Sequence, residues 1–427
     1  MKVYVVGGYV RDKLLGLEPR DADFVVVGSS PEEMIEKGFQ QVGKDFPVFI
    51  HPITGDEYTL ARVERKVGVG YEGFECDWKG VTLNEDLKRR DLTINSMAQE
   101  VKVYEDGSFK VIDYPVGKRG YFDLNEGILR PTGDHFKEDP LRVLRLARFS
   151  SKYPEFTVHE KCFEYTLDLQ DELNFITPER IWIETEKSLK EKDPCKYFEY
   201  LTKWCHGFEF IKIFREMQYT VENNDYHQED NVFVHTMMVL KHSRDNWNDS
   251  EISFACLLHD IAKPECYRER GKGHGHDAEG ISMIEDFCKK WKVPNNYRDL
   301  AKHVCEQHQR IHTVLGRNEN NWARPKTIMS IFEKTNALSK PERFLKILKA
   351  CESDAKGRIG KSSQDDYLQK PYLEDCLEAV ISLDTKVISS KLLENGKSGK
   401  VLGDEIRAAR INEIRKVMNN WKERLNA

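Results

Sequence analysis

Residues 3–28 read VYVVGGYVRDKLLGLEPRDADFVVVG, and this stretch decides the fold of the N-terminal part of the chain. Two apolar, strand-like runs enclose a pair of glycines ending at Gly8 and a pair of aspartates, Asp21 and Asp23. Glycine lets the backbone turn sharply and approach a ligand because it has no Cβ, and the N–H groups that follow can bind phosphate. The stretch therefore predicts a phosphate-binding turn at Gly8, with Arg11 able to bind the same phosphates.

Asp21 and Asp23 are separated by one residue, so on a strand both carboxylates would point to the same side. Mg²⁺ prefers such hard oxygen ligands, and two ions could hold the attacking and leaving oxygens of a phosphoryl transfer. Either half of the pattern alone is common in turns and at exposed strand ends. Together they predict a metal-dependent nucleotidyl transfer site, with Asp21 and Asp23 as catalytic residues and Mg²⁺ ligands.

A second cluster, LKRRDLTINSMA at 87–98, places polar side chains before an apolar run. Arg90 could bind a triphosphate, while Asp91 and Asn95 could bond a sugar hydroxyl. The alternative is that Asp91 simply caps the helix that follows.

A third cluster, FKEDPLRVLRLARF at 136–149, predicts a helix on which Asp139, Arg142 and Arg145 share one face. Cytosine and adenine both present an amino donor beside a ring-nitrogen acceptor, whereas uracil and guanine present a carbonyl beside a ring N–H. A carboxylate that accepts and a guanidinium that donates therefore fit C and A and misfit G and U. Asp139 and Arg142 could select the base; the alternative is an ordinary surface ion pair.

Composition places few limits on the function. The chain has 427 residues and a net charge of -6, so a nucleic-acid partner would need a local basic surface. Its ten cysteines are scattered without a C-x-x-C pair, which predicts reduced thiols. No apolar run is long enough for a membrane helix or a signal peptide, and we expect a cytoplasmic protein without a membrane partner.

Strand signals dominate the first hundred or so residues, and amphipathic helical patterns dominate after about Leu141. This predicts an α+β fold: a head of mixed sheet with helices, then an all-helical remainder. Loop-like composition near 140, 221–231 and 315–327 suggests the boundaries. We expect segments at 1–140, 141–222, 223–335 and 336–427.

The helical part holds a second set of chemistry-bearing residues, spread over five short stretches. Imidazoles and carboxylates from separate helices can together bind a divalent metal. The expected ligands are His235, His259, Asp260 and Asp354, the last supplied from beyond 335. A His-Asp dipeptide alone is more often an ordinary hydrogen-bonded feature, so the prediction depends on the ordered set.

The motifs GGYVRD, RDADF, KDFPVFIHP, LKRRDLTIN, EDPLRVLRLARF and TPERIWIETEK, in this order, resemble the class II tRNA nucleotidyltransferases. These are the CCA-adding enzymes of the polymerase β superfamily, and the resemblance covers almost the whole chain. It implies a polymerase β-like head and template-independent addition of C, C and A to the 3′ end of tRNA from CTP and ATP, with release of pyrophosphate.

The same resemblance implies roles for individual residues. Asp21 and Asp23 would hold Mg²⁺, and Asp139 with Arg142 would read the base. The nucleotide would be contacted by Gly8, Arg11, Arg90, Arg142 and Arg145. The stretch ERKVGVGYEGF at 64–74 would be the loop that switches specificity, and TPERIWIETEK would support the base-reading helix without touching substrate. The general base stays open between Asp23 and the more distant Glu57.

The helical half is similar to the HD phosphohydrolase domain of the gammaproteobacterial-type enzymes. That similarity implies phosphatase and 2′,3′-cyclic phosphodiesterase activity with a divalent metal, often Ni²⁺. His274, His276 and His308 would line the phosphate side. One position departs from the pattern: Ala262 stands where glycine is usual after HDI, and its methyl group could crowd the pocket.

Three other functions fit parts of the pattern. A bacterial poly(A) polymerase shares the head motifs, and a partial enzyme would add only CC or only A. A degenerate RNA-binding or nucleotide-sensing protein would lack a metal carboxylate, and both are present here. The sequence leaves open the surface that binds tRNA and whether the chain is a monomer or a homodimer.

Overall fold

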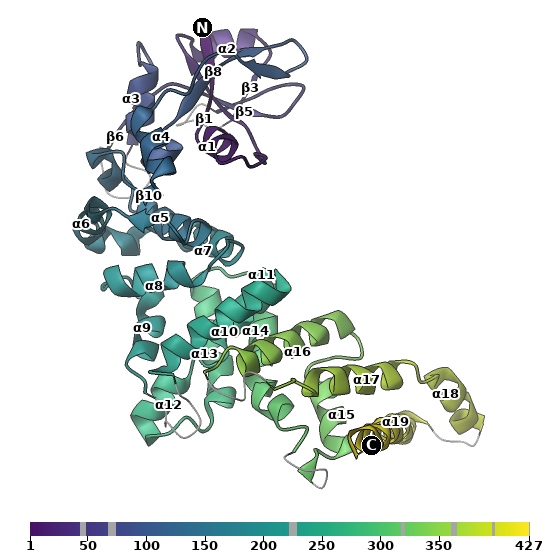
Figure 1. The fold of residues 1–427 in the computed structure, drawn as a ribbon. Coiled ribbons are helices and arrows are strands. Elements are labelled where there is room, and N and C mark those ends of the chain that lie inside the picture. Colours follow the sequence, from purple (N-terminus) through teal and green to yellow (C-terminus); the bar gives the residue numbers. More distant parts are fainter. Residues whose placement is uncertain are drawn as a thin grey trace. The chain divides into compact units, whose positions relative to one another are not determined.

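The computed structural model describes residues 1–42, 48–66, 74–221, 229–316, 321–359, 365–394 and 398–426 (Figure 1). It divides into two compact units, Met1–Lys212 and Ile213–Ala427. The first unit contains the sheet together with several helices, and the second is helical. The predicted α+β class, with a mixed-sheet head followed by helices, is confirmed.

A seven-stranded mixed sheet organises the first unit, with the order β3-β4-β5-β2-β1-β8-β9. Only the β2–β5 pair is parallel; the other neighbours are antiparallel. The strands are β1 Lys2–Val6, β2 Asp23–Val27, β3 Gln40–Val42, β4 Val48–Ile50, β5 Glu57–Leu60, β8 Ala98–Val103 and β9 Phe109–Val111. A separate hairpin pairs β6 Val63–Lys66 with β7 Phe74–Asp77.

The two glycines end β1 as the sequence predicts. Gly7 has φ 63°, a conformation that favours glycine, and the chain turns there into α1 Gly8–Leu14. The last paired residues of β1 and β2 are Val6 and Asp23. Because β1 turns away at Gly7, the chain before Asp23 has no strand to pair with. Asp21 therefore precedes the strand, and the expectation that both aspartates lie on it is wrong.

Helices cover the rest of the first unit. They are α2 Pro31–Glu36, α3 Leu83–Lys88, α4 Lys118–Asn125, α5 Leu141–Lys152, α6 Glu160–Asp168, α7 Pro178–Leu189 and α8 Cys195–Trp204, while α9 Lys212–Gln218 lies at the boundary. The α5 helix buries an apolar face that includes Val143, Leu144 and Leu146, and it packs against α7 and α8. This packing fixes the predicted base-reading helix within the unit.

Asp139 does not lie on α5, as the sequence pattern had suggested. The helix begins at Leu141, and Asp139 is extended, with φ -126° and ψ 112°. The residue before a proline is disfavoured in the helical region, and Pro140 follows. Asp139 instead precedes the helix, and its Oδ1 accepts a hydrogen bond from the N–H of Leu141 at 2.9 Å.

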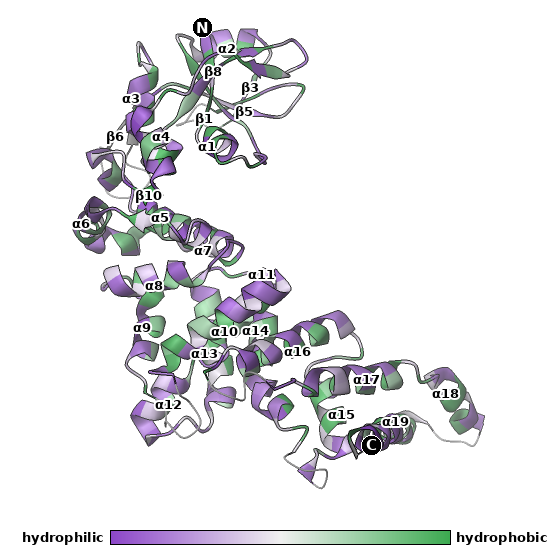
Figure 2. Cartoon of the chain, viewed as in Figure 1, coloured by the Kyte–Doolittle hydropathy of each residue, from purple (hydrophilic) through white to green (hydrophobic). Residues whose placement is uncertain are grey.

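The second unit is a stack of helices with both hydrophobic and hydrophilic residues along each (Figure 2). They are α10 Val232–Trp247, α11 Ser250–Leu258, α12 Lys263–Arg270, α13 His276–Lys290, α14 Asn295–His312, α15 Pro325–Lys334, α16 Pro341–Lys356, α17 Gln369–Ile381, α18 Thr385–Glu394 and α19 Gly399–Asn426. The α14 helix packs against α11, α13 and α16. Among the described residues, no helix is long and apolar enough to cross a membrane.

Candidate active sites

A cavity of about 550 Å³ lies in the first unit and gathers most of the residues predicted from the sequence. Those that line it are Gly8, Arg11, Asp23, Arg90, Asp91, Asn95, Asp139, Arg142 and Arg145. Nine arginine or lysine side chains and four carboxylates line the cavity in all. This excess of positive charge is the local basic surface that a polyanion needs on a chain whose net charge is negative.

Asp23 lies at the edge of this cavity, beside the glycine turn. It also lines an adjoining cavity together with Asp21, and Glu57 lines both. Burial raises the pKa of the Asp23 carboxyl and the charge of Asp21 adds to the rise, whereas Arg90 lowers it. Two carboxylates that repel each other and line one cavity form a donor set that suits a divalent cation.

A chain of hydrogen bonds through the buried side chains of Arg11, Asn95 and Asp91 connects α1 to the half-buried Arg145 of α5. Arg11 Nη1 donates to Asn95 Oδ1 at 2.5 Å, and Asn95 Nδ2 donates to Asp91 Oδ1 at 3.0 Å. Asp91 Oδ2 accepts from Arg145 Nε at 2.8 Å. Although burial opposes it, Arg145 holds the pKa of Asp91 well below its usual range. We call Arg11, Asn95, Asp91 and Arg145 the buried relay.

The relay changes the interpretation of Asp91. Its Oδ1 also accepts the N–H of Leu92 at 2.7 Å, just before the short 3-10 helix η1 Thr93–Asn95. Asp91 thus contacts the adjacent backbone N–H and anchors Arg145, but it does not form the helix cap that the alternative expected, because Leu92 is the cap residue of η1 and no side chain caps it. With both oxygens engaged by protein groups, Asp91 positions its neighbours in addition to facing the cavity.

The base-reading pair is held by contacts that the sequence did not suggest. Asp139 Oδ2 forms an ion pair with Arg180 Nη2 at 2.8 Å, and Arg142 Nη1 donates to the backbone oxygen of His135. Arg180 belongs to the TPERIWIETEK motif and lines the same cavity. The motif therefore lines the cavity and holds the Asp139 carboxylate, while its lack of contact with substrate stays a prediction. The Thr-Pro pair at the start of the motif indicates only the start of a helix, so nothing in the sequence indicated the contact between Arg180 and Asp139.

Asp86 is a further residue that sequence reasoning missed. It is fully buried and pairs with Arg89 at 2.6 Å and with Arg90 at 3.2 Å. The Arg90 guanidinium approaches the glycine turn so closely that a Cβ on Gly7 would lie 3.2 Å from Nη1. Asp86 precedes the arginines by one helical turn, and that i, i+4 spacing is the signal that could have found it. Residues 67–73, most of the predicted switching loop, lie outside the described residues.

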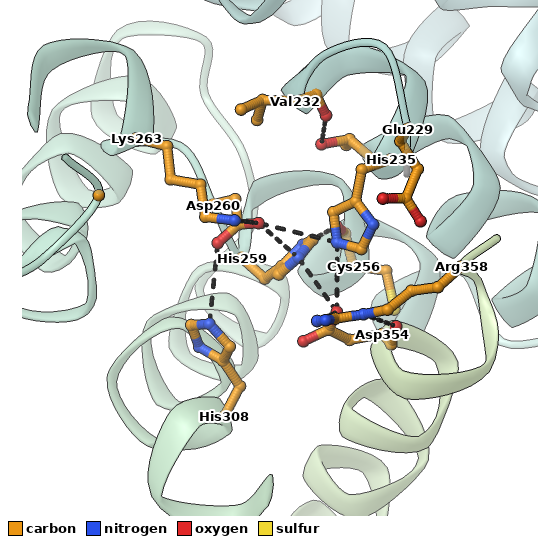
Figure 3. A network of polar contacts seen from close by, with 12 residues as sticks. Glu229, Val232, His235, Cys256, His259, Asp260, Lys263, His308, Asp354 and Arg358 are labelled. Carbon is orange, nitrogen blue, oxygen red and sulfur yellow. Dashed lines mark hydrogen bonds and ion pairs between the residues drawn. The ribbon is translucent and has the colours of Figure 1, made fainter. Parts of the chain in front are cut away.

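The second unit brings together all four metal ligands predicted for it (Figure 3). His235, His259 and Asp354 each offer an atom within 4.8 Å of the others. Asp260 Oδ2 lies 3.0 Å from His259 Nε2 and 3.8 Å from His235 Nε2. Burial lowers the pKa of His235, which keeps its imidazole in the neutral form that binds metals. Imidazole and carboxylate donors on separate helices fit a divalent ion.

A second group of three lies against the first: Asp260, His276 and His308. Asp260 Oδ1 lies 3.1 Å from His276 Nε2 and 3.7 Å from His308 Nε2. Two of the three histidines predicted to line the phosphate side are thus buried beside Asp260. The third, His274, is exposed and belongs to neither group.

Several neighbours that the sequence did not indicate orient this cluster. His312 Nε2 lies 2.7 Å from Asp354 Oδ2, and the Tyr367 hydroxyl contacts His312 Nδ1 at 2.8 Å. Arg358 pairs with Asp354 at 2.7 Å, and Lys263 with Asp260 at 2.9 Å. The spacing of His308 and His312, one helical turn apart, was the available signal for the first of these.

Ala262 fits the packing without displacing a ligand. It is buried, and a Cβ on Gly280 of α13 would lie 3.8 Å from its methyl group. That distance is ordinary van der Waals contact, and a Cβ on Gly280 would instead meet Cys305 Sγ at 2.4 Å, so Gly280 makes room for the cysteine and not for the alanine. The four predicted ligands lie close together with the alanine in place, and an effect of its methyl group on the pocket stays a prediction.

Three models of known protein families match parts of this chain. The family model "Poly A polymerase head domain" matches residues 3–130, "Probable RNA and SrmB- binding site of polymerase A" matches 155–204, and "HD domain" matches 232–354. The "Multifunctional CCA protein" of Shewanella frigidimarina is 40% identical over 99% of this chain and 98% of its own. The chain belongs to the multifunctional CCA protein family. The resemblance that the motifs indicated is confirmed.

Solved structures of CCA-adding enzymes share the fold of this member of the multifunctional CCA protein family. A complex of a CCA-adding enzyme with CTP has a TM-score of 0.60 at 19% identity and covers 100% of this chain and 92% of that one. The Thermotoga maritima CCA-adding enzyme complexed with tRNA has a TM-score of 0.56 at 19% identity, covering 98% and 91%. At this identity the likeness shows the fold.

Replacing Asp91 tests the buried relay. Because the pKa of Asp91 is lower in the folded chain, its carboxylate stabilises the fold above about pH 4, and this contribution is lost as the pH falls further. Asp91→Asn should lower the free energy of unfolding by about 1–3 kcal/mol near neutral pH. Urea unfolding should show the difference from wild type shrinking toward about pH 3.

Asp168→Asn is the matched control, since its partner Lys137 and Asp168 itself are both exposed. Its effect should stay below about 1 kcal/mol at any pH. An equal loss in both variants would contradict a structural role for the relay.

Proposed function

We propose that this chain adds C, C and A to the 3′ end of tRNA from CTP and ATP and releases pyrophosphate. The observation that carries the proposal is the arginine-rich cavity, lined by Asp23 and the glycine turn, in a member of the multifunctional CCA protein family. The excess of cations supports a triphosphate ligand, and the tRNA phosphates are a second polyanion.

The proposed division of labour follows the contacts. Gly8, Arg11 and Arg90 lie where the glycine turn meets the cavity, so they would hold the triphosphate. As the terminal ribose hydroxyl attacks the α-phosphate and pyrophosphate leaves, charge develops on the phosphate oxygens. Arginines fixed in advance by Asp86 and by the relay stabilise that charge without reorganising.

Asp21 and Asp23 would hold Mg²⁺, which neutralises phosphate charge and aligns the reacting oxygens when bound. The fit rests on the donor set, two neighbouring carboxylates that line a common cavity. Glu57 lies on the same side and remains a candidate to accept the hydroxyl proton beside Asp23.

Asp139 and Arg142 would select the base. Arg180 and the N–H of Leu141 fix the Asp139 carboxylate, while each oxygen retains a second lone pair for an amino group of C or A. The contact to His135 similarly limits the orientation of Arg142. Base selection by a rigid carboxylate and guanidinium requires both to be held, which supports Arg180 as a positioning residue.

We further propose that the second unit is a metal-dependent phosphohydrolase acting on phosphomonoesters and 2′,3′-cyclic phosphates. The buried His235, His259, Asp260 and Asp354 cluster carries this part of the proposal. Imidazole-rich sites suit Ni²⁺ among other divalent ions, and the ion would supply a Lewis acid for the phosphate. The segments 1–140, 141–222, 223–335 and 336–427 remain the proposed domain limits, with Asp354 contributed from beyond the third.

A cytoplasmic location is also proposed. Nine of the cysteines are buried free thiols, as expected for a reducing compartment.

Incubating the protein with tRNA that lacks its last three nucleotides tests the transferase. With CTP and ATP the product should end in a single CCA, whereas a long adenosine run would identify a poly(A) polymerase and a CC or A end a partial enzyme. Asp21→Asn with Asp23→Asn should reduce incorporation at least about a hundredfold. Filter binding should show tRNA still bound, and retained incorporation would place the chemistry elsewhere.

Arg180→Ala should loosen base selection. Without its ion pair Asp139 can rotate, and discrimination worth about 1–3 kcal/mol would weaken, so misincorporation of UTP or GTP relative to CTP should rise about tenfold or more. Single-nucleotide incorporation assays measure this ratio. Lys187→Ala, an exposed change on the same helix, should leave the ratio unchanged. A uniform loss of activity with unaltered selectivity would argue against positioning.

His235→Ala should lower Ni²⁺-supported hydrolysis of a 2′,3′-cyclic nucleotide at least about tenfold. CCA addition should persist because the transferase cavity lies in the first unit. Release of the nucleoside monophosphate is the readout. Unchanged hydrolysis would remove the buried cluster as the hydrolytic site.

A further inference from the structure

The arginine-rich cavity adjoins a second cavity of about 500 Å³ in the same unit, and Asp23 and Glu57 line both. The second cavity is also lined by the carboxylates of Asp21 and Asp56, and its one basic lining residue among those that the structure describes is Arg20. We call it the acidic cavity. Its charge is opposite to that of the arginine-rich cavity, so it disfavours a triphosphate and suits a ligand that presents hydroxyl donors.

The two cavities are placed as a phosphoryl transfer requires. The attacking hydroxyl and the departing pyrophosphate lie roughly in line on opposite sides of the α-phosphate. With the triphosphate in the arginine-rich cavity and its α-phosphate beside Asp23, the attacking hydroxyl has to come from another side. The acidic cavity shares Asp23 and Glu57, so a ribose placed in it would lie next to the reacting phosphate.

Two aromatic side chains line the acidic cavity. Tyr9 lies at the start of α1, directly after the glycine turn, and Phe109 begins β9. Their ring centroids are 5.5 Å apart at an interplanar angle of 63°, and Phe109 also packs edge-on against the buried Phe24 at 5.1 Å. Both rings are only half-buried, so each keeps accessible surface. Accessible aromatic surface in a cavity is what a nucleic-acid base stacks on.

Stacking also matches the tolerance that an acceptor end requires. During the proposed addition the terminal nucleotide of the acceptor changes: it is first the last nucleotide of the shortened tRNA, then the first added C, then the second. A site that reads base edges by hydrogen bonds would fit only some of these ends, whereas every base has a π-face. None of the described side chains that line the acidic cavity is an amide, the type that pairs a donor and an acceptor with one base edge.

We propose that the acidic cavity holds the terminal nucleotide of the acceptor tRNA, with its base stacked on Tyr9 and Phe109 and its ribose hydroxyl beside Asp23. The proposal rests on the CCA addition proposed above, and it assigns the acceptor site of that reaction. Arg20 is exposed and would meet the phosphate that precedes the bound nucleotide. Base selection then belongs to the arginine-rich cavity, and base-tolerant stacking belongs to the acidic one.

Photo-crosslinking tests the position of the acceptor end without any turnover. The wild-type chain is mixed with tRNA that lacks its last three nucleotides and carries 5-iodouridine as its terminal nucleotide, with no CTP or ATP present. Irradiation joins 5-iodouracil preferentially to an aromatic ring stacked on it, and mass spectrometry of the digested chain locates the bond. The crosslink should fall on Tyr9 or Phe109. Crosslinks at other residues only, or none to either ring, overturn the proposal.

Tyr9→Leu removes the ring but keeps an apolar side chain. It should raise the KM for tRNA about tenfold and leave the KM for CTP unchanged, because it removes a stacking contact and Tyr9 does not line the arginine-rich cavity. Tyr9→Phe should keep wild-type values, and Phe109→Leu should share the loss. Tyr114→Leu is the matched control, since Tyr114 is 87% exposed and lines neither cavity, and it should change neither KM.

A tRNA whose terminal nucleotide lacks its base separates stacking from a merely structural effect. Wild type and Tyr9→Leu should show the same KM for this tRNA, because there is no base left to stack. A tenfold difference that persists on it overturns the proposal. A chain that crosslinks at Tyr9 but adds no nucleotide would sustain the acceptor site and reject the transferase function. CCA addition with the same KM for intact tRNA in wild type and Tyr9→Leu would reject the acceptor site alone.

Discussion

The transferase half depends on one constraint: its cations are held in place by buried carboxylates. Asp91 anchors Arg145 and, through Asn95, Arg11; Asp86 anchors Arg90. Guanidinium groups in an empty cavity would otherwise repel one another and move apart. Because the anchors are buried, the cavity keeps its shape before a nucleotide enters, and the cost of ordering the arginines is met during folding.

The second unit also contains buried carboxylates paired with basic side chains, but its site suits cations instead of an anion. Asp260 and Asp354 are buried acceptors, and Lys263 and Arg358 pair with them at the edge of a histidine cluster. Imidazoles whose Nδ1 atoms bond to backbone carbonyls offer lone pairs toward the centre. The transferase cavity therefore suits an anion, whereas the histidine cluster suits cations, and the difference follows from which partner is buried and fixed.

Much of this could be predicted from the sequence, because the strongest signals are local. The glycine turn, the strand that ends in it, the Ser30 cap of α2 and the long helix after Pro140 follow from short-range rules. The missed features depend on tertiary packing. Strand β8 pairs with β1 although AQEVKV carries a weak strand pattern, and Arg180 reaches Asp139 only because α7 packs on α5. The division of six histidine and aspartate side chains between two groups likewise depends on helix packing that no spacing specifies.

A crystal structure of the full chain with CTP and Mg²⁺ tests the central claim most directly. The account predicts the triphosphate between the Gly8 turn and Arg90, an ion about 2.0–2.1 Å from oxygens of both Asp21 and Asp23, and the cytosine edge bonded to Asp139 and Arg142. The buried relay should be unchanged from the structure described here. A nucleotide bound outside this cavity, or an ion that touches neither aspartate, would contradict it.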